Sequence, residues 1–123
     1  MILAVLEKRA GLRLGAHDVF VNLAGGLRAV EPGVDLAVAL AVASSSLDRP
    51  FPDNAVAVGE IGLGGELRSV GQMDSRLRDA AKLGFTTAIV PARCRISTDL
   101  KDLKLEKVSY VADAIGYLKP ALT

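Results

Sequence analysis

The sequence is poor in the residues that build disulfide frameworks, metal centres and membrane spans. It contains one cysteine, Cys94, and one histidine, His17, so neither an intrachain disulfide nor a zinc site of His and Cys ligands can form. The longest strongly apolar run, residues 36–43, is far shorter than the about 18 residues of a membrane span. No basic segment followed by a long apolar one opens the chain. We therefore expect no structural metal, no membrane span and a cytoplasmic location.

Aromatic side chains and net charge are also scarce. Tryptophan is absent, and the three Phe and two Tyr residues mostly occur in apolar patterns, which leaves few rings to stack on the bases of a single strand. The 15 basic and 14 acidic residues give a net charge of +1, which argues against a wholly basic nucleic-acid binder. The charge is uneven, however: residues 68–95 contain six basic and two acidic side chains. This segment is either an ordinary solvated surface or a binding patch.

The 123 residues, half of them hydrophobic, are enough for one compact domain over 1–123. Hydrophobic patterns predict strands at 2–7, 17–23, 54–59, 86–90 and 105–109, a glycine-broken hairpin at 61–70, and a surface excursion at 92–104. Helices are predicted after Pro32, from Gln72 to a cap at Gly84, and over 110–118. Hairpins mixed with helices favour an α+β fold with a mixed sheet and about three helices.

Isolated motifs give little support for catalysis. The glycine-rich stretch 59–71 is not followed by Gly-Lys-Ser/Thr and leads into a strand, so it does not predict a phosphate loop. His17 has no Cys nearby and only one adjacent carboxylate. Cys94 lies between Arg93 and Arg95, which favours a lowered thiol pKa, but without a partner base we interpret it as an incidental loop residue.

Longer motifs carry a resemblance to a known family. They are VLEKRAGL at 5–12, DVFVN at 18–22, AGG at 24–26, EP at 31–32 with DL at 35–36, GEIGL at 59–63, GELR at 65–68, AKLGF at 81–85 and IVP at 89–91. Over residues 3–118 the chain resembles the C-terminal domain of the RadA (Sms) family of bacterial DNA repair proteins. That domain is in turn similar to the proteolytic domain of Lon protease. The resemblance therefore implies a Lon-like fold, similar to domain 2 of ribosomal protein S5.

The Lon resemblance also identifies the positions at which a peptidase would hold its reactive groups. Lon proteases use a serine that opens a helix and a lysine at the start of the second helix. The matching positions here are Gly33 and Asp74, so nucleophile and base are both missing and we expect no peptidase activity. An active Ser/Lys peptidase using Ser69 or Ser75 is disfavoured because neither has a suitable neighbouring base.

The RadA resemblance implies a role in ATP-dependent recombination, repair and branch migration. The family's zinc finger and RecA-like ATPase core have no counterpart in these 123 residues, so ATP, Mg and Zn are expected only there and no cofactor is expected here. Implied partners are double-stranded or branched DNA, further copies in a hexameric ring, and the RecA recombinase.

We expect the domain to contact DNA phosphates without catalysis and to help hold the ring. The predicted DNA contacts are Arg28, Arg68, Arg76, Arg78 and Lys82, with Lys8 and Arg9 as a second group. Arg78 could instead pair with Asp74 one turn earlier. The main alternative is a pure oligomerisation scaffold whose charges face neighbouring subunits.

Overall fold

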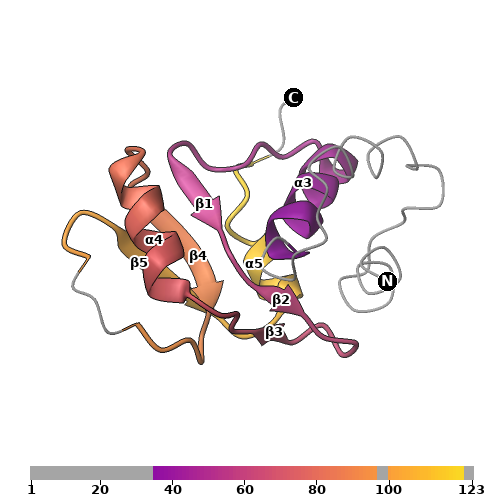
Figure 1. Cartoon of the computed structure of the whole chain (residues 1–123). Coiled ribbons are helices and arrows are strands. Elements are labelled where there is room, and N and C mark those ends of the chain that lie inside the picture. Colours follow the sequence, from indigo (N-terminus) through magenta and orange to yellow (C-terminus); the bar gives the residue numbers. More distant parts are fainter. Residues whose placement is uncertain (1–34, 97–99, 121–123) are drawn as a thin grey trace.

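The computed structural model describes residues 35–96 and 100–120 (Figure 1). Its elements, in chain order, are α3 (Asp35–Leu47), β1 (Ala55–Ala57), β2 (Glu60–Ile61), β3 (Leu67–Arg68), α4 (Met73–Lys82), β4 (Thr87–Pro91), β5 (Lys104–Val108) and α5 (Val111–Ile115). The strands predicted at 2–7 and 17–23 lie outside the described residues, as do Lys8, Arg9, Arg28 and Gly33. The elements predicted after Pro32 are confirmed, although α5 is shorter than expected and Pro91 is the last residue of β4.

The described strands form two separate sheets. β4 is the centre of a parallel sheet in the order β1-β4-β5, with Ala55 opposite Thr87 and Thr87 opposite Lys104. β2 and β3 form an antiparallel hairpin in which Glu60 is opposite Arg68. The chain is thus α+β, with three helices and both kinds of strand pairing in the described part, as predicted. Its Lon-like classification stays a prediction.

Alternate residues of β4 point to opposite faces of the parallel sheet, and helices cover both faces. Ala88 and Val90 pack with Met73 and Leu77 of α4 in one core cluster. Ile89 belongs to a second cluster, which contains the buried residues of α3 and α5. Figure 1 shows α4 on one side and α3 and α5 on the other. The apolar run of β4 is therefore buried on both faces, and the strand forms the middle of the fold.

The start of α3 is joined to the hairpin by backbone contacts. The amide N–H of Ile61 donates to Oδ2 of Asp35 over 3.2 Å, and the N–H of Leu36 donates to the carbonyl of Gly59 over 3.0 Å. Gly59 is close to β4 as well, because an added Cβ would lie 3.0 Å from Cγ of Pro91. These contacts fix the position of the hairpin relative to α3 and β4.

The ends of α4 show how its predicted limits arise. Gln72 precedes the helix with φ of 61°, and Gly84 follows it with φ of 94°, the left-handed conformation that glycine adopts at little cost. The predicted glycine cap is thus confirmed. The predicted surface excursion at 92–104 is only partly correct, because Cys94 and Leu103 are buried against α4 and β4. Their side chains fill the space at the edge of this core cluster.

Candidate nucleic-acid interface

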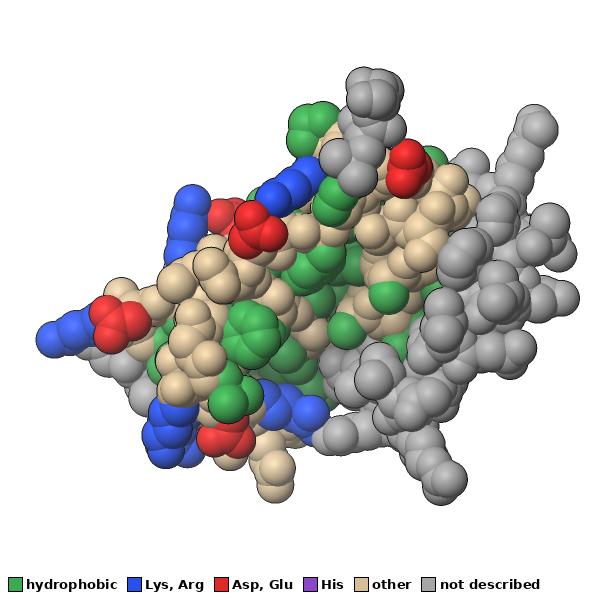
Figure 2. All heavy atoms as spheres, turned by 90° about the horizontal axis from the view of Figure 1, so that it is seen from above, with side chains coloured by type: hydrophobic (Ala, Val, Ile, Leu, Met, Phe, Trp, Pro, Cys, Tyr) green, Lys and Arg blue, Asp and Glu red, His purple; other side chains and the backbone are tan. Residues whose placement is uncertain are grey.

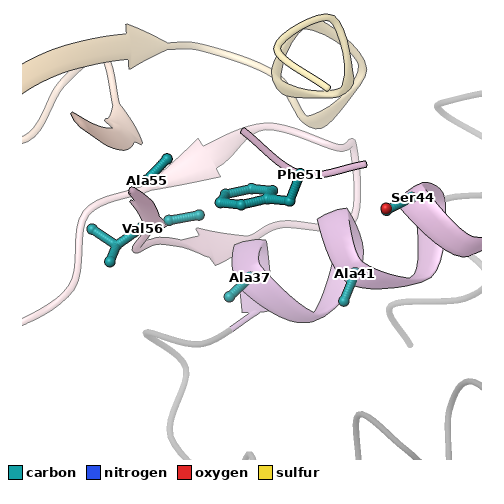
Figure 3. Close-up of a pocket in the computed structure, with 7 residues that line it drawn as sticks. Ala37, Ala41, Ser44, Phe51, Ala55 and Val56 are labelled. Atoms are coloured by element: carbon teal, nitrogen blue, oxygen red, sulfur yellow. The ribbon is translucent and has the colours of Figure 1, made fainter. Parts of the chain in front are cut away.

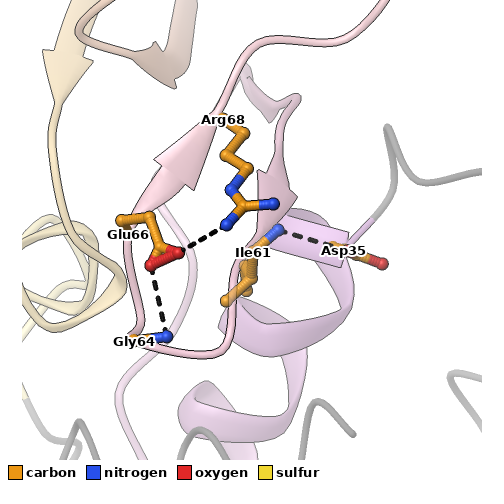
Figure 4. Close-up of polar contacts among 5 residues, drawn as sticks. All are labelled: Asp35, Ile61, Gly64, Glu66 and Arg68. Atoms are coloured by element: carbon orange, nitrogen blue, oxygen red, sulfur yellow. Dashed lines mark hydrogen bonds and ion pairs between the residues drawn. The ribbon is translucent and has the colours of Figure 1, made fainter.

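The β2–β3 hairpin holds Arg68 in an ion pair (Figure 4). Nη2 of Arg68 lies 2.9 Å from Oε1 of Glu66, whose Oε2 accepts the Gly64 N–H over 3.2 Å. The hydrogen bond from its own backbone N–H, together with Arg68, keeps the pKa of Glu66 below its usual value. Gly62 makes room for this arrangement, because an added Cβ there would meet the Glu66 carboxylate. Arg68 is still 57% exposed, so its guanidinium is accessible to an anion.

The predicted cations of α4 lie on two different sides of the helix. Arg78 and Lys82 are exposed and four residues apart, and so they lie one turn apart on the side facing away from buried Met73 and Leu77. Arg76 is on another flank, where its Nε donates to the carbonyl of Gly71 over 3.1 Å. Over the described ranges, no ion pair joins Arg78 to Asp74, the pairing that the sequence left open. The four described members of the predicted patch therefore do not form one surface.

Two adjoining hollows form a groove beside the hairpin. The larger, of about 760 Å³, and the smaller, of about 420 Å³, share Ser69 and Arg93. The groove lies where β4 and β5 end, since Arg93 follows β4 and Tyr110 follows β5. We call it the arginine groove. Its charged lining residues are Arg68, Arg93, Arg95, Glu66 and Asp74.

The lining of the arginine groove therefore contains three guanidinium groups and two carboxylates. Glu66 is already neutralised by Arg68, whereas Arg93 and Arg95 are exposed and form no ion pair among the described residues. Asp74 is in the first turn of α4 and half-buried. The groove is thus a weakly positive concave surface, suited to an anionic chain rather than to a single highly charged ion.

Sequence reasoning did not select Arg93, Arg95 or Tyr110 as site residues. Arg93 and Arg95 belong to the basic segment, but nothing in their spacing indicated that they would lie beside the hairpin. The available signal was their place just after a buried strand, since ligands of parallel sheets bind at the carboxyl ends of the strands.

Tyr110 is the exposed aromatic residue of the groove. The residue is 53% exposed and borders the larger hollow, although the aromatic residues mostly occur in apolar sequence patterns. Hydrogen bonds of its neighbours fix its backbone: the Val111 N–H donates to Gly65 O and the Leu67 N–H to Ser109 O, both over 2.9 Å. Tyr110 itself forms an isolated bridge with Glu66. The ring is therefore accessible on a rigid support.

Other surfaces of the described part are less suited to a polyanion. A hollow of about 490 Å³ between α3 and β1 is lined mainly by alanine and valine side chains, and Figure 3 shows the Phe51 ring between the strand and the helix. On the face shown in Figure 2, most Lys and Arg side chains lie beside Asp or Glu, around an apolar centre. Neither surface offers several cations to one ligand.

Cys94 differs from its sequence-based interpretation. The side chain is 6% exposed, and burial raises the pKa of its thiol, so the lowered pKa suggested by its arginine neighbours was wrong. The described residues contain no group of three His, Cys, Asp or Glu side chains that could hold a metal ion. Over the same ranges, no helix has the length and apolarity required to cross a bilayer.

Comparison with known proteins identifies the family. Residues 2–94 match the family model described as "Subunit ChlI of Mg-chelatase". The chain belongs to this family. It is also similar to proteins named DNA repair protein RadA, at 46% identity over 120 residues in Synechocystis sp., 43% over 122 residues in Chlamydia pneumoniae and 44% over 118 residues in Aquifex aeolicus.

These alignments cover 98%, 96% and 96% of this chain, respectively, but only 24%, 27% and 26% of the relatives. The chain thus spans about a quarter of the length of the RadA proteins it matches. The resemblance to RadA inferred from the sequence motifs is confirmed.

Proposed function

We propose that this chain is a non-catalytic DNA-binding domain of a RadA-type repair protein. The observation that carries the proposal is the presence of exposed cations on two surfaces, the arginine groove and the outer side of α4 with Arg78 and Lys82. The relatives' name, DNA repair protein, supplies the class of ligand. Guanidinium and ammonium groups bind phosphates whatever the base sequence, so the binding would be salt-sensitive and weakly sequence-specific.

The proposal includes the absence of peptidase chemistry. Gly33 has no side-chain nucleophile, and Asp74 offers a carboxylate where a Lon protease has its lysine. Within the whole protein, we propose that an ATPase core outside this chain holds ATP and Mg, that a zinc finger holds Zn, and that the assembled ring acts with RecA in branch migration. This chain would contribute the contact with duplex or branched DNA.

A salt titration of duplex binding tests the DNA-binding role. We expect binding that weakens steeply with salt, and an Arg78→Ala/Lys82→Ala double variant whose log–log slope is shallower by about 0.9 for each phosphate that the variant no longer neutralises. The matched control removes two ion-paired cations, Lys104 and Lys119, and should retain more of the slope. Absence of duplex binding by the parent chain at low salt would refute the proposal.

A second candidate function, contact between copies of the chain, would involve two exposed leucines. Leu63 at the hairpin turn is 73% exposed, and Leu83 after α4 is 78% exposed. Single exposed leucines are ordinary on protein surfaces, so Leu63 and Leu83 serve here as the positions at which this contact is tested. If they assemble the ring, Leu63→Ser should reduce the mass measured by light scattering. A parent chain that remains monomeric at high concentration would argue against this role for the isolated chain.

A further inference from the structure

We propose that the arginine groove binds a single-stranded segment of nucleic acid, with the Tyr110 ring stacking on a base and Arg68, Arg93 and Arg95 holding the backbone phosphates. The inference deepens the proposed function, on which it rests, by assigning an unpaired strand to the groove. Duplex would be bound by the outer side of α4. The two surfaces together would suit DNA that is branched or partly opened.

The shape of the groove favours an unpaired strand. Its two hollows, of about 760 and 420 Å³, are each within the size range of pockets that hold small ligands, so each can accommodate a nucleotide. In a duplex the bases are paired and stacked inside the helix, where a ring at the protein surface cannot reach their faces. A base that is to meet Tyr110 must therefore be unpaired.

The chemistry of the lining points to the same ligand. Proteins that bind single strands combine a positive groove along the backbone with aromatic rings on which bases stack. Here Arg93 lines both hollows, Arg95 lies in the smaller one, and Arg68 and Tyr110 border the larger one. Arg68 reaches the groove with its guanidinium 57% exposed while it is paired with Glu66, so it can also contact a phosphate.

The rigidity of the Tyr110 backbone strengthens the argument. The hydrogen bonds to Gly65 and Ser109 attach the start of α5 to the hairpin, so the backbone that carries the ring does not have to be ordered when a base binds. Asp74 at the far end of the groove opposes phosphate binding there, and its neutral isostere should bind more tightly.

The test compares labelled oligothymidylate with a labelled duplex of equal length, by fluorescence anisotropy at low salt. We expect Tyr110→Ala to weaken oligothymidylate binding at least about fivefold, which corresponds to about 1 kcal/mol of stacking on one base, and to change duplex binding less than about twofold. Tyr110→Phe keeps the ring and should bind like the parent. Tyr117→Ala, which removes the other exposed tyrosine away from the groove, is the matched control.

Arg93→Ala and Asp74→Asn test the electrostatic part of the inference. Arg93→Ala should make the salt slope for oligothymidylate shallower by about 0.7, and Asp74→Asn should increase its affinity. Circular dichroism and thermal unfolding establish that each variant is folded. Tyr110→Ala and Tyr110→Phe that both bind oligothymidylate like the parent would overturn the inference, as would a parent that binds duplex only. A parent that binds neither nucleic acid would instead refute the proposed function.

Discussion

Arg49 should contribute substantially to stability, because it joins two segments distant in the sequence. Its Nη2 donates to the carbonyl of Leu118 over 2.7 Å and its Nε to the carbonyl of Lys119 over 2.9 Å. These carbonyls follow α5, where backbone acceptors lack partners within the helix. The Lys119 N–H in turn donates to Pro50 O over 2.8 Å. Arg49 thus fixes the segment after α5 against the loop after α3.

The expected cost of Arg49→Ala follows from these two bonds. The part-buried bond to Leu118 should contribute about 1.5 kcal/mol, the low end for a charged donor, and the solvent-exposed bond to Lys119 about 0.5 kcal/mol. We therefore expect the free energy of unfolding to fall by about 2 kcal/mol. With an unfolding entropy of about 2.1 cal/mol/K per residue over 123 residues, the change lowers Tm by about 8 °C.

Thermal and urea unfolding followed by circular dichroism measure the effect. Arg49→Lys keeps the charge but cannot donate two bonds in the same geometry, so it should fall between parent and alanine variant. Lys119→Ala breaks an exposed ion pair with Asp53 and should change the free energy of unfolding by less than about 1 kcal/mol. An Arg49→Ala variant with the parent's Tm would show that the two bonds add nothing to stability.

Three further predictions concern Cys94, the Glu106–Tyr117 pair and peptidase activity. Cys94 should react slowly with a thiol reagent in the folded chain and rapidly in urea, because burial raises its pKa; equal rates would contradict its buried position. Glu106 accepts a hydrogen bond from the Tyr117 hydroxyl, and the bonds from Lys104 and Tyr117 lower the pKa of Glu106. The contribution of ionised Glu106 to the free energy of unfolding is therefore present above the usual pKa of Glu, and it is lost as the pH falls through the lower pKa of the folded state. In Glu106→Gln this acid dependence should decrease and the raised pKa of Tyr117 should fall in an ultraviolet titration, whereas an unchanged titration would rule out the contact. A fluorogenic peptide should not be hydrolysed, and turnover that survives purification would restore the peptidase alternative.

The sequence predicted the local elements well because their signals are local. Leu36 and Leu40 marked α3, the positive-φ glycine after α4 marked its end, and the apolar run to Val90 marked the central strand. In each case the residues within one segment of the sequence were sufficient for the prediction.

The groove could not be predicted in the same way, because it depends on contacts between distant segments. Arg93 and Tyr110 are 17 positions apart and meet only because β4 and β5 are parallel neighbours, with Pro91 opposite Val108. Conversely, Arg76 and Arg78 are near neighbours in sequence but lie on different sides of α4, so charge density along the chain overestimated the patch.

The central position of β4 has a consequence for biosynthesis. Its partner β1 is separated from it in the sequence by the hairpin and α4, and its other partner, β5, leaves the ribosome only after residue 103. While the ribosome is still translating the crossover that follows Pro91, one edge of an apolar strand has no neighbour on that side. Closure of this sheet therefore has to wait for β5, while the pairing of β4 with β1 spans 32 positions and is the more non-local, slower contact.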